Sequence, residues 1–302
     1  MMAIDLHTHT IYSDGGLEPE ELVRKAKEIG LSALAIADHD SVSALEEGLK
    51  IAQEVGIELV PALEISSYPD EENEFHILGY FIDWQNSVLV STLKHFQEVR
   101  DKRAHKIAER LNELGYQVSY EEIRKQAKGT IVQPHVAAAV IGNPANEKKL
   151  KQEFGVSPKT GDFIREHLIQ GKDAYITREA LTPKEALDLI HKAGGITSLA
   201  HPCWNLVKKD SASGELVFDD AGLKELVKIG LDGIEVYAHR ENEADTRACV
   251  DHYLKLATEL NLVASGGSDF HGYGSAGKKL GFEDFYLKVP DAVLDELKKF
   301  KR

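Results

Sequence analysis

Short runs of apolar residues alternate along most of the chain with longer segments in which apolar residues recur at helical spacing. The runs lie at residues 3–6, 33–37, 57–62, 75–81, 196–200, 233–237 and 262–266. Most of them are short and apolar on both faces, which is typical of strands that helices cover. The alternation predicts an α/β fold with a largely parallel sheet of these runs.

Helix start signals lie between several of the runs. Pro19 opens the segment after the first run, and proline is favoured at the first position of a helix. Ser43 and Glu46 have the spacing of a capping box, and so do Thr182 and Glu185 later in the chain. These pairs predict two further helix starts.

Residues 92–180 break the alternation, because helix-like segments follow one another there without a convincing strand. We expect residues 1–91 and 181–302 to form one α/β domain around a single core. Residues 92–180 are expected to form a helical insertion, which can cap the side chains that the strands present.

Composition and charge narrow the classes of function. The chain has 302 residues, of which 42% are hydrophobic and 28% charged, as in ordinary globular proteins. A net charge of −14 argues against stable binding to duplex DNA or to anionic membranes. An anionic substrate remains compatible with it, because bound cations can reverse the local field.

The chain carries no sign of export or of membrane insertion. Cys203 and Cys249 are far apart in the sequence and follow no ligand pattern, so no disulfide framework is expected. The first run leaves no room for a signal peptide, and no run approaches the roughly 18 residues of a membrane span. We therefore expect a cytoplasmic protein in which Cys203 is a buried apolar group rather than a nucleophile.

Imidazole and carboxylate side chains accompany six of the seven runs. One His-x-His pair would be weak evidence, but the carboxyl ends of barrel strands converge on one mouth. The side chains that we expect to meet there as metal ligands are His7, His9, Asp14, His39, Glu64, His76, His201, Asp269 and His271. The remaining helix-like segments carry His95, His105, His167, His191 and His252, which we expect to be ordinary surface or half-buried residues.

A mixed set of imidazoles and carboxylates without thiolates suits Zn²⁺, Mn²⁺ or Fe²⁺ better than Ca²⁺ or Mg²⁺. The set is large enough for two or three divalent ions if Glu64 or Asp269 bridges. Ions ~3.5–4 Å apart can share an activated hydroxide and stabilise both the attacking and the leaving oxygen. The residues thus predict a metal-dependent hydrolase, with a phosphate ester as the favoured substrate.

In order along the chain, the motifs "HTH", "SDG", "ADHD", "HILGYF", "LAHP" and "GSDFHG" resemble those of the PHP (polymerase and histidinol phosphatase) family. The resemblance implies a distorted (β/α)7 TIM-like barrel with a trinuclear metal site. It places His7, His9, Glu64 and Asp269 around one ion. Glu64 would bridge to a second ion with His76 and His201, and Asp14, His39 and His271 would hold a third.

The insertion resembles that of stand-alone PHP phosphoesterases that remove the 3′-phosphate from nucleoside 3′,5′-bisphosphates, some of which also trim short RNA from its 5′ end. An Arg-Pro-His segment of the subgroup reaches the substrate phosphate. Here Gln133 replaces the arginine, while Pro134 and His135 remain. The resemblance implies that His135 contacts the phosphate of a small nucleotide or short single-stranded RNA. Arg178 can supply part of the missing charge.

Other roles and functions stay open at this stage. Asp38, Asp40, Glu235 and His239 can orient ligands or provide the proton for the leaving oxygen. A phosphatase acting on histidinol phosphate or another small molecule shares the chemistry. An amidohydrolase also uses His-x-His, but it often needs a strand-end lysine, which the chain lacks. A non-catalytic module would use the metal for stability alone.

Overall fold

The structure is a computed structural model that describes residues 3–69, 74–272, 279–282 and 287–300. The described residues form an eight-stranded sheet in the order β10-β1-β2-β3-β4-β5-β8-β9. Its strands are β1 (Ala3–Thr8), β2 (Leu31–Ile36), β3 (Glu58–Ser67), β4 (Phe75–Tyr80), β5 (Ile196–Leu199), β8 (Gly233–Tyr237), β9 (Val263–Gly266) and β10 (Val289–Pro290). Each of the seven apolar runs therefore contributes a strand, and the α/β class is confirmed.

Two short features were not expected from the sequence. β10 is a two-residue strand that pairs antiparallel with the start of β1. β6 (Val207–Lys209) and β7 (Leu216–Phe218) form a separate antiparallel hairpin. Three-residue strands with lysines and exposed valine carry too little alternation to stand out in a sequence.

The direction of β4 decides where one candidate ligand lies. β1, β2 and β3 are mutually parallel, as are β5, β8 and β9, but β4 runs antiparallel to both β3 and β5. Ser66, near the end of β3, pairs with His76, near the start of β4. The beginning of β4 therefore lies at the same edge as the carboxyl ends of the parallel strands.

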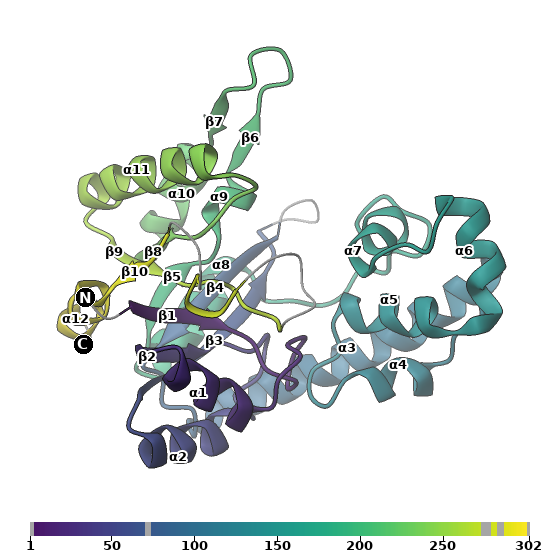
Figure 1. Cartoon of the computed structure of the whole chain (residues 1–302), viewed down its shortest axis with the longest axis horizontal. Coiled ribbons are helices and arrows are strands. Elements are labelled where there is room, and N and C mark those ends of the chain that lie inside the picture. The colour runs from purple at the N-terminus through teal and green to yellow at the C-terminus, as the bar shows by residue number, and fades with distance from the viewer. Residues whose placement is uncertain (1–2, 70–73, 273–278, 283–286, 301–302) are drawn as a thin grey trace.

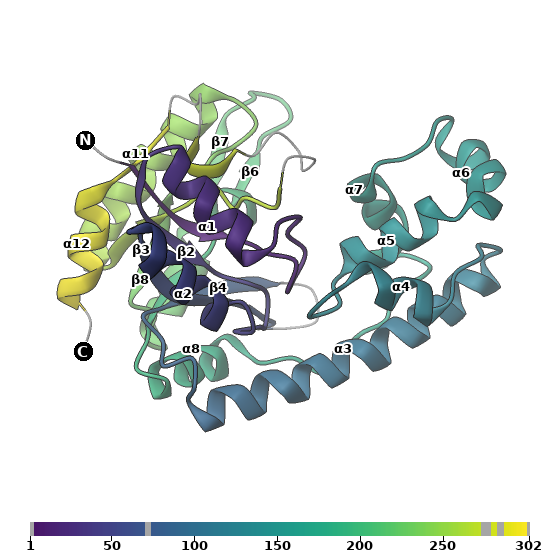
Figure 2. The same cartoon turned by 60° about the horizontal axis from the view of Figure 1, so that its bottom comes forward.

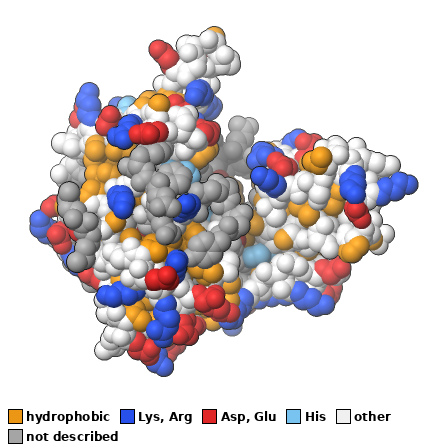
Figure 3. Space-filling view, viewed as in Figure 1, with side chains coloured by type: hydrophobic (Ala, Val, Ile, Leu, Met, Phe, Trp, Pro, Cys, Tyr) orange, Lys and Arg blue, Asp and Glu red, His pale blue; other side chains and the backbone are white. Residues whose placement is uncertain are grey.

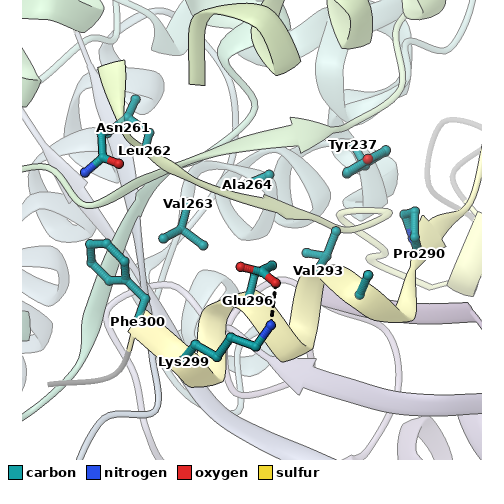
Figure 4. Close-up of a pocket in the computed structure, with 11 residues that line it drawn as sticks. Tyr237, Asn261, Leu262, Val263, Ala264, Pro290, Val293, Glu296, Lys299 and Phe300 are labelled. Atoms are coloured by element: carbon teal, nitrogen blue, oxygen red, sulfur yellow. Dashed lines mark hydrogen bonds and ion pairs between the residues drawn. The ribbon is translucent and has the colours of Figure 1, made fainter. Parts of the chain in front are cut away.

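The sheet curls into a nearly closed barrel. Residues after β9 return to β1, where Thr8 forms a parallel bridge with Phe270 and the backbone N–H of His9 donates to the Phe270 carbonyl at 2.9 Å. Near the start of β9, the strand and α12 (Asp291–Phe300) border a groove of about 580 Å³ (Figure 4). None of the candidate metal ligands lines this groove.

Helices cover the outside of the barrel (Figure 1). They are α1 (Pro19–Glu28), α2 (Leu45–Val55), α8 (Pro183–Lys192), α9 (Pro202–Asn205), α10 (Asp220–Lys228), α11 (Glu243–Leu260) and α12. Pro19 is the first residue of α1, and Thr182 and Glu185 form a capping box at α8. The expected cap at Ser43 is wrong: α2 begins at Leu45 after Ala44, because residues 42–45 first form a turn.

The helical part comprises α3 (Ser87–Glu113), α4 (Tyr120–Gln126), α5 (Gln133–Gly142), η1 (Pro144–Asn146), α6 (Glu147–Phe154), α7 (Thr160–Phe163) and η2 (Ile164–Leu168). It has an apolar cluster of its own, whose buried members lie between Ala104 and Ala174. α3 belongs to both bodies, since Leu89 and Leu93 pack in the barrel cluster while Ile107 and Leu111 pack in the helical cluster.

Figure 2 shows α3 running from below α8 out to α4, and the returning segment (residues 169–182) leads back alongside it. In the space-filling view a hollow separates the barrel from the helical part (Figure 3). We propose that the helical part comprises residues 92–180 and the barrel the remaining residues. The first boundary of this division falls inside α3. No helix among the described residues combines the length and apolarity that a membrane crossing requires.

Candidate metal centre

Glu64 lies at the centre of the candidate site. β3 carries its side chain into the barrel mouth, where it is fully buried. One carboxylate oxygen, Oε1, lies 3.0 Å from Nδ1 of His76 and 3.0 Å from Nε2 of His201. The reversed β4 and the end of β5 therefore bring two imidazoles to the same oxygen.

The other oxygen of Glu64, Oε2, faces a second group of imidazoles. It lies 3.3 Å from Nε2 of His7, 3.3 Å from Nε2 of His9 and 3.1 Å from Nδ1 of His39. His7 and His9 come from the end of β1 and its loop, whereas His39 follows β2. One carboxylate thus separates two sets of imidazoles, which is the position that a bridging ligand occupies.

Two further carboxylates complete the cluster. Asp269 Oδ1 lies 3.2 Å from Nε2 of His9 and 3.5 Å from Nε2 of His7. Asp14 Oδ1 lies 3.2 Å from Nε2 of His271 and 3.8 Å from Nε2 of His39. All the side chains expected as ligands therefore converge, although they come from six separate stretches of the chain.

The backbone around the cluster adopts conformations that most residues avoid. His201 has φ 32°, Asp269 has φ 53° and Asp40 has φ 47°, all in the left-handed region that costs a non-glycine residue energy. At Gly267 a Cβ would stand 2.3 Å from the backbone nitrogen of His7. The loop after β9 therefore approaches β1 closely only because this residue is glycine.

The side chains fit divalent metal ions. Bonds of about 2.1 Å to one ion place neighbouring ligand atoms roughly 3.0–3.4 Å apart, close to the 3.0–3.5 Å separations around Glu64 and Asp269. Among the described residues, Asp14 Oδ1, His39 Nδ1 and Glu64 Oε2 are buried without a hydrogen-bond partner. Buried polar atoms are rarely left unpaired, so these atoms fit the role of ligands to cations.

The carboxylates and imidazoles of the cluster shift one another's pKa values in both directions. Burial acts to lower the pKa of His7 and of His76, but the neighbouring carboxylates raise the first well above its usual range and the second to about 10. Burial alone would raise the pKa of Glu64, but the surrounding imidazoles, first of all His39, hold it well below its usual range. Burial lowers the pKa of His39 to about 4. The site therefore presents an ionised carboxylate beside a neutral imidazole at neutral pH, and these are the forms that bind a metal.

Glu235 and Asp38 hold the loops that carry the imidazoles. Glu235 Oε1 lies 2.9 Å from Nδ1 of His7, and its Oε2 accepts the backbone N–H of His201 at 2.6 Å. Asp38 accepts a hydrogen bond from the Ser13 hydroxyl at 2.6 Å, and that hydroxyl lies 3.3 Å from Nδ1 of His9. Glu235 thus contacts two candidate ligands directly, whereas Asp38 reaches His9 through the Ser13 hydroxyl.

The other two residues of this group lie differently. Asp40 forms a buried ion pair with Arg100 of α3. Burial acts to raise the pKa of Asp40, but the charges of Arg100 and Arg178 and the hydrogen bond from Arg100 together lower it. His239 packs its ring against Trp204 and Phe282.

Arg100 and Asp5 are site residues that the sequence analysis missed. Arg100 continues the buried positions of α3 at four-residue spacing from Phe96 to Ala104, so an arginine on the apolar face was the available signal. Asp5 accepts hydrogen bonds from the N–H and hydroxyl of Ser268, at 2.9 and 2.6 Å, which ties β1 to the loop that carries Asp269. Its signal was a carboxylate inside an apolar run.

The helical part touches the loop after β1. The backbone N–H of Thr130 donates to the Tyr12 carbonyl at 3.0 Å, and Lys128 pairs with Glu18 at 2.7 Å. A Cβ on Gly129 would stand 2.0 Å from the Tyr12 carbonyl oxygen, so this contact also depends on a glycine. His135 is buried on α5, close enough for the Asp14 carboxylate to act on its pKa, which burial lowers.

Gln133 and Arg178, the two residues considered for the charge of the subgroup's arginine, contact different parts of the chain. The Gln133 side chain donates to the Leu168 carbonyl within the helical part at 2.9 Å. Arg178, in the returning segment, lies over the ring of Tyr68 with its guanidinium carbon 5.3 Å from the ring centre.

The other histidines contact residues outside the cluster. Their partners are Glu179 for His95, Tyr120 for His105, Glu153 for His167, Asp232 for His191 and Asp220 for His252. Cys203 is fully buried in the barrel cluster, as expected for a small apolar group.

Known proteins resemble this chain over most of its length. Residues 5–155 match the model of the PHP domain. A protein of Haemophilus influenzae named 5′-3′ exoribonuclease is 32% identical over 94% of this chain and 97% of its own. A protein of Chromobacterium violaceum named 3′,5′-nucleoside bisphosphate phosphatase is 28% identical over 93% of this chain and 91% of its own.

The fold is similar to solved structures too. A protein of Bifidobacterium adolescentis described as a metal-dependent phosphoesterase superposes with a TM-score of 0.78 at 27% identity, covering 98% of this chain and 95% of that one. Sequence, fold and a metal-binding cluster at the barrel mouth agree, and the chain belongs to the PHP family of metal-dependent phosphoesterases, which are hydrolases of phosphoric esters.

Proposed function

We propose that the enzyme removes the terminal phosphate of a small nucleotide, namely the 3′-phosphate of a nucleoside 3′,5′-bisphosphate, and that it also acts on the 5′ ends of short RNA. The observation that carries the proposal is the convergence of imidazoles on both oxygens of Glu64, next to a hollow that the helical part borders. The names of the two relatives, a nucleoside bisphosphate phosphatase and an exoribonuclease, support the choice of nucleotide substrates.

We assign the ligands to three divalent ions, with manganese, zinc or iron as the candidates. The first would be held by His7, His9, Glu64 and Asp269, the second by Glu64, His76 and His201, and the third by Asp14, His39 and His271. The distances around Glu64 and between Asp14 and His271 support this division. His39 lies between the groups, since its Nδ1 is 3.1 Å from Glu64 Oε2 and its Nε2 is 3.8 Å from Asp14 Oδ1. His9 stands near the first and the third group, since its Nδ1 lies 3.9 Å from Asp14 Oδ1.

The bound cations would supply positive charge at the phosphoryl group and lower the pKa of water at the site. The chain's own residues would prepare this chemistry. Glu235 and Asp38 fix the orientation of the imidazoles through hydrogen bonds. His135 and Arg178 would contact the substrate phosphate from the helical part and from the returning segment, and the helical part would limit the access of bulk water.

A panel of substrates tests the proposal. Protein purified and loaded with Mn²⁺ is incubated with adenosine 3′,5′-bisphosphate, a short 5′-phosphorylated oligoribonucleotide, histidinol phosphate and an aryl phosphate, and products are measured. We expect the highest kcat/KM with the bisphosphate. A preference for histidinol phosphate of tenfold or more would replace the nucleotide by that substrate without changing the chemistry.

Substitution of ligands tests the metal assignment separately. His9→Ala and Asp269→Ala should abolish turnover and lower the metal content measured by elemental analysis, while the protein remains folded. His95→Ala is the matched control, because His95 is half-exposed on α3 and pairs with Glu179. Full activity in either ligand variant would refute the assignment.

A further inference from the structure

His201 is held at two points in the turn after β5. Its backbone has φ 32°, and its N–H donates to Glu235 Oε2 at 2.6 Å. Nε2 of its ring lies 3.0 Å from Glu64 Oε1, so this nitrogen faces the proposed second ion. The other ring nitrogen, Nδ1, lies 3.3 Å from Nδ2 of Asn205. The ring therefore has one nitrogen available to a metal ion and one in contact with Asn205.

Asn205 reaches His201 because the chain turns back directly after the strand. Pro202 opens α9, and the backbone N–H groups of Trp204 and Asn205 donate to the His201 carbonyl at 2.9 and 3.4 Å. Residues four apart lie on the same face of a helical turn, so the Asn205 side chain returns to the His201 ring. α9 then leads to the hairpin of β6 and β7 (Figure 1). The contact therefore arises within one short stretch of the chain.

Four other candidate ligands have outer partners of a different kind, in which an oxygen can accept a hydrogen bond. These partners are the Glu235 carboxylate for His7, the Ser13 hydroxyl for His9, the Glu74 carboxylate for His76 and the Asp269 carbonyl for His271. Such an oxygen can accept the N–H of an imidazole whose other nitrogen binds a metal. Asn205 differs from them, because a carboxamide has an acceptor at one end and a donor at the other.

The two ends of the amide suit two states of His201. In the structure the NH₂ group of Asn205 faces Nδ1, which suits an imidazole that carries its proton on Nε2, beside the Glu64 oxygen. A metal at Nε2 needs the lone pair there, so the proton then resides on Nδ1 and faces a donor. A half-turn of the amide about its last torsion brings Oδ1 to Nδ1 instead, and this oxygen accepts the hydrogen bond.

The Asn205 amide has room for this half-turn. The residue is exposed and borders a cavity of about 760 Å³, whose wall also includes Phe75, next to His76, and Lys208 of the hairpin. The NH₂ group and the oxygen are also nearly equal in size, so the two orientations fill the same space. Asn205 thus combines direct contact with a candidate ligand and freedom to rotate.

We propose that Asn205 is a positioning residue for the second ion, and that its amide donates to His201 in the metal-free enzyme and accepts from His201 in the loaded enzyme. The inference rests on the proposed assignment of His76 and His201 to that ion and deepens it. In both orientations a hydrogen bond at Nδ1 fixes the plane of the His201 ring. Within the described part of the chain, His201 is the one candidate ligand to which Asn205 is hydrogen-bonded through its side chain, so its loss should affect one of the three ions.

Zinc binding tests the inference. Metal-free wild type, Asn205→Leu, Asn205→Asp and His201→Ala are titrated with Zn²⁺ in competition with a chelator. Leucine has a similar size but no hydrogen-bonding group, so Asn205→Leu should bind one ion about 10- to 100-fold more weakly and the others as wild type does. Aspartate keeps an acceptor, so Asn205→Asp should bind that ion at least as tightly as wild type. Trp204→Phe is the matched control and should bind as wild type does, because Trp204 lies on the same turn but donates to the His239 carbonyl at 3.0 Å.

A second readout follows the proton on His201. In zinc-loaded protein with isotope-labelled histidine, NMR detects the Nδ1 proton, which is assigned by its absence from His201→Ala. Its exchange with water should be at least about tenfold faster in Asn205→Leu than in wild type or Asn205→Asp.

The outcomes separate the inference from the ligand assignment on which it rests. If Asn205→Leu binds every ion with wild-type affinity, or if its His201 proton exchanges at the wild-type rate, Asn205 has no positioning role. A loss in Asn205→Asp as large as that in Asn205→Leu would overturn the inference too. If His201→Ala itself binds every ion as tightly as wild type, the proposed ligand assignment fails, and the role of Asn205 fails with it. Loss of an ion in His201→Ala but not in Asn205→Leu keeps the assignment and removes Asn205 alone.

Discussion

Glu235→Gln separates the orientation of a ligand from the ligand itself. The side chain is fully buried in β8 and contacts Nδ1 of His7 at 2.9 Å through one oxygen and the backbone N–H of His201 at 2.6 Å through the other. Glutamine has the same shape, so packing around β8 should not change. Glutamate accepts hydrogen bonds at both terminal oxygens, whereas glutamine accepts at its oxygen and donates from its NH₂ group. Glutamine can therefore accept only one of the two hydrogen bonds, that from His7 or that from His201.

We expect Glu235→Gln to weaken metal binding. In the metal-free variant, His7 can carry its proton on Nε2, so that Nδ1 accepts from the glutamine amide. A bound metal needs the lone pair on Nε2 and moves the proton to Nδ1, where it faces an NH₂ group. One buried donor is then unsatisfied, which costs about 1–3 kcal/mol. We expect metal affinity to fall about 10- to 100-fold.

Competition with a metal chelator measures this affinity for wild type and variant, and kcat is compared at saturating Mn²⁺. Asp232→Asn is the matched control. Asp232 is also a buried carboxylate, and it accepts the backbone N–H of Thr197 at 3.0 Å and contacts His191 at 2.6 Å, but at the opposite ends of β5 and β8. Equal metal affinity in wild type and Glu235→Gln would refute the reasoning, and so would equal losses in both variants.

Three further expectations use other contacts. Gly129→Ala places a methyl group 2.0 Å from a carbonyl oxygen of the loop after β1, so it should lower the free energy of unfolding by about 1–3 kcal/mol and also lower kcat/KM. Gly142→Ala is the control, because its methyl group would meet no atom within 4 Å, and it should lower neither quantity. Thermal melting and steady-state kinetics measure both. His135→Ala should lower kcat/KM and leave metal content unchanged, and a variant with wild-type kinetics would remove His135 from substrate binding. Burial acts to raise the pKa of Asp232, but hydrogen bonds from His191 and Thr197 keep it lowered. Its stabilising effect is therefore present above the pKa of unfolded aspartate, about 3.9, and is lost as pH falls through the lower folded value. Asp232→Asn should lose stability at pH 7 and show a weaker dependence on acid than wild type in unfolding experiments, and an unchanged dependence would contradict this.

The strands and the ligand cluster could be predicted because both leave local marks. Each of the seven longer strands is an apolar run, and most of the imidazoles of the cluster directly follow these runs, so that convergence at one mouth needs only the general rule for barrels. The short β6, β7 and β10 leave no such mark and were not predicted. His76 shows where this reasoning was incomplete. A side chain at the start of a strand reaches the mouth only if that strand is reversed, and the apolar pattern of residues 75–81 carries no information about strand direction.

The contacts between the helical part and the barrel could not be predicted, because they depend on how segments distant in the sequence approach each other in space. The pairing of Arg100 with Asp40 joins residues 60 positions apart. The contact of Gly129 with Tyr12 depends on a distance that no sequence spacing encodes. The predicted start of α2 was wrong for a local reason. Residues 42–45 form a turn, so the helix begins at Leu45 and Ser43 does not cap it.

The contact between Arg100 and Asp40 links the helical part to the ligands themselves. Asp40 directly follows His39, adopts a left-handed conformation, and donates its backbone N–H to the Glu64 carbonyl at 2.9 Å. Its carboxylate is buried, so loss of the arginine would leave an uncompensated charge, at a cost of about 3–5 kcal/mol. Since α3 supplies that arginine, any displacement of α3 strains the turn that holds His39 beside Glu64. The position of the helical part and the geometry of the metal ligands are therefore coupled through one ion pair, and substitutions on the buried face of α3 should affect catalysis even where they contact neither metal nor substrate.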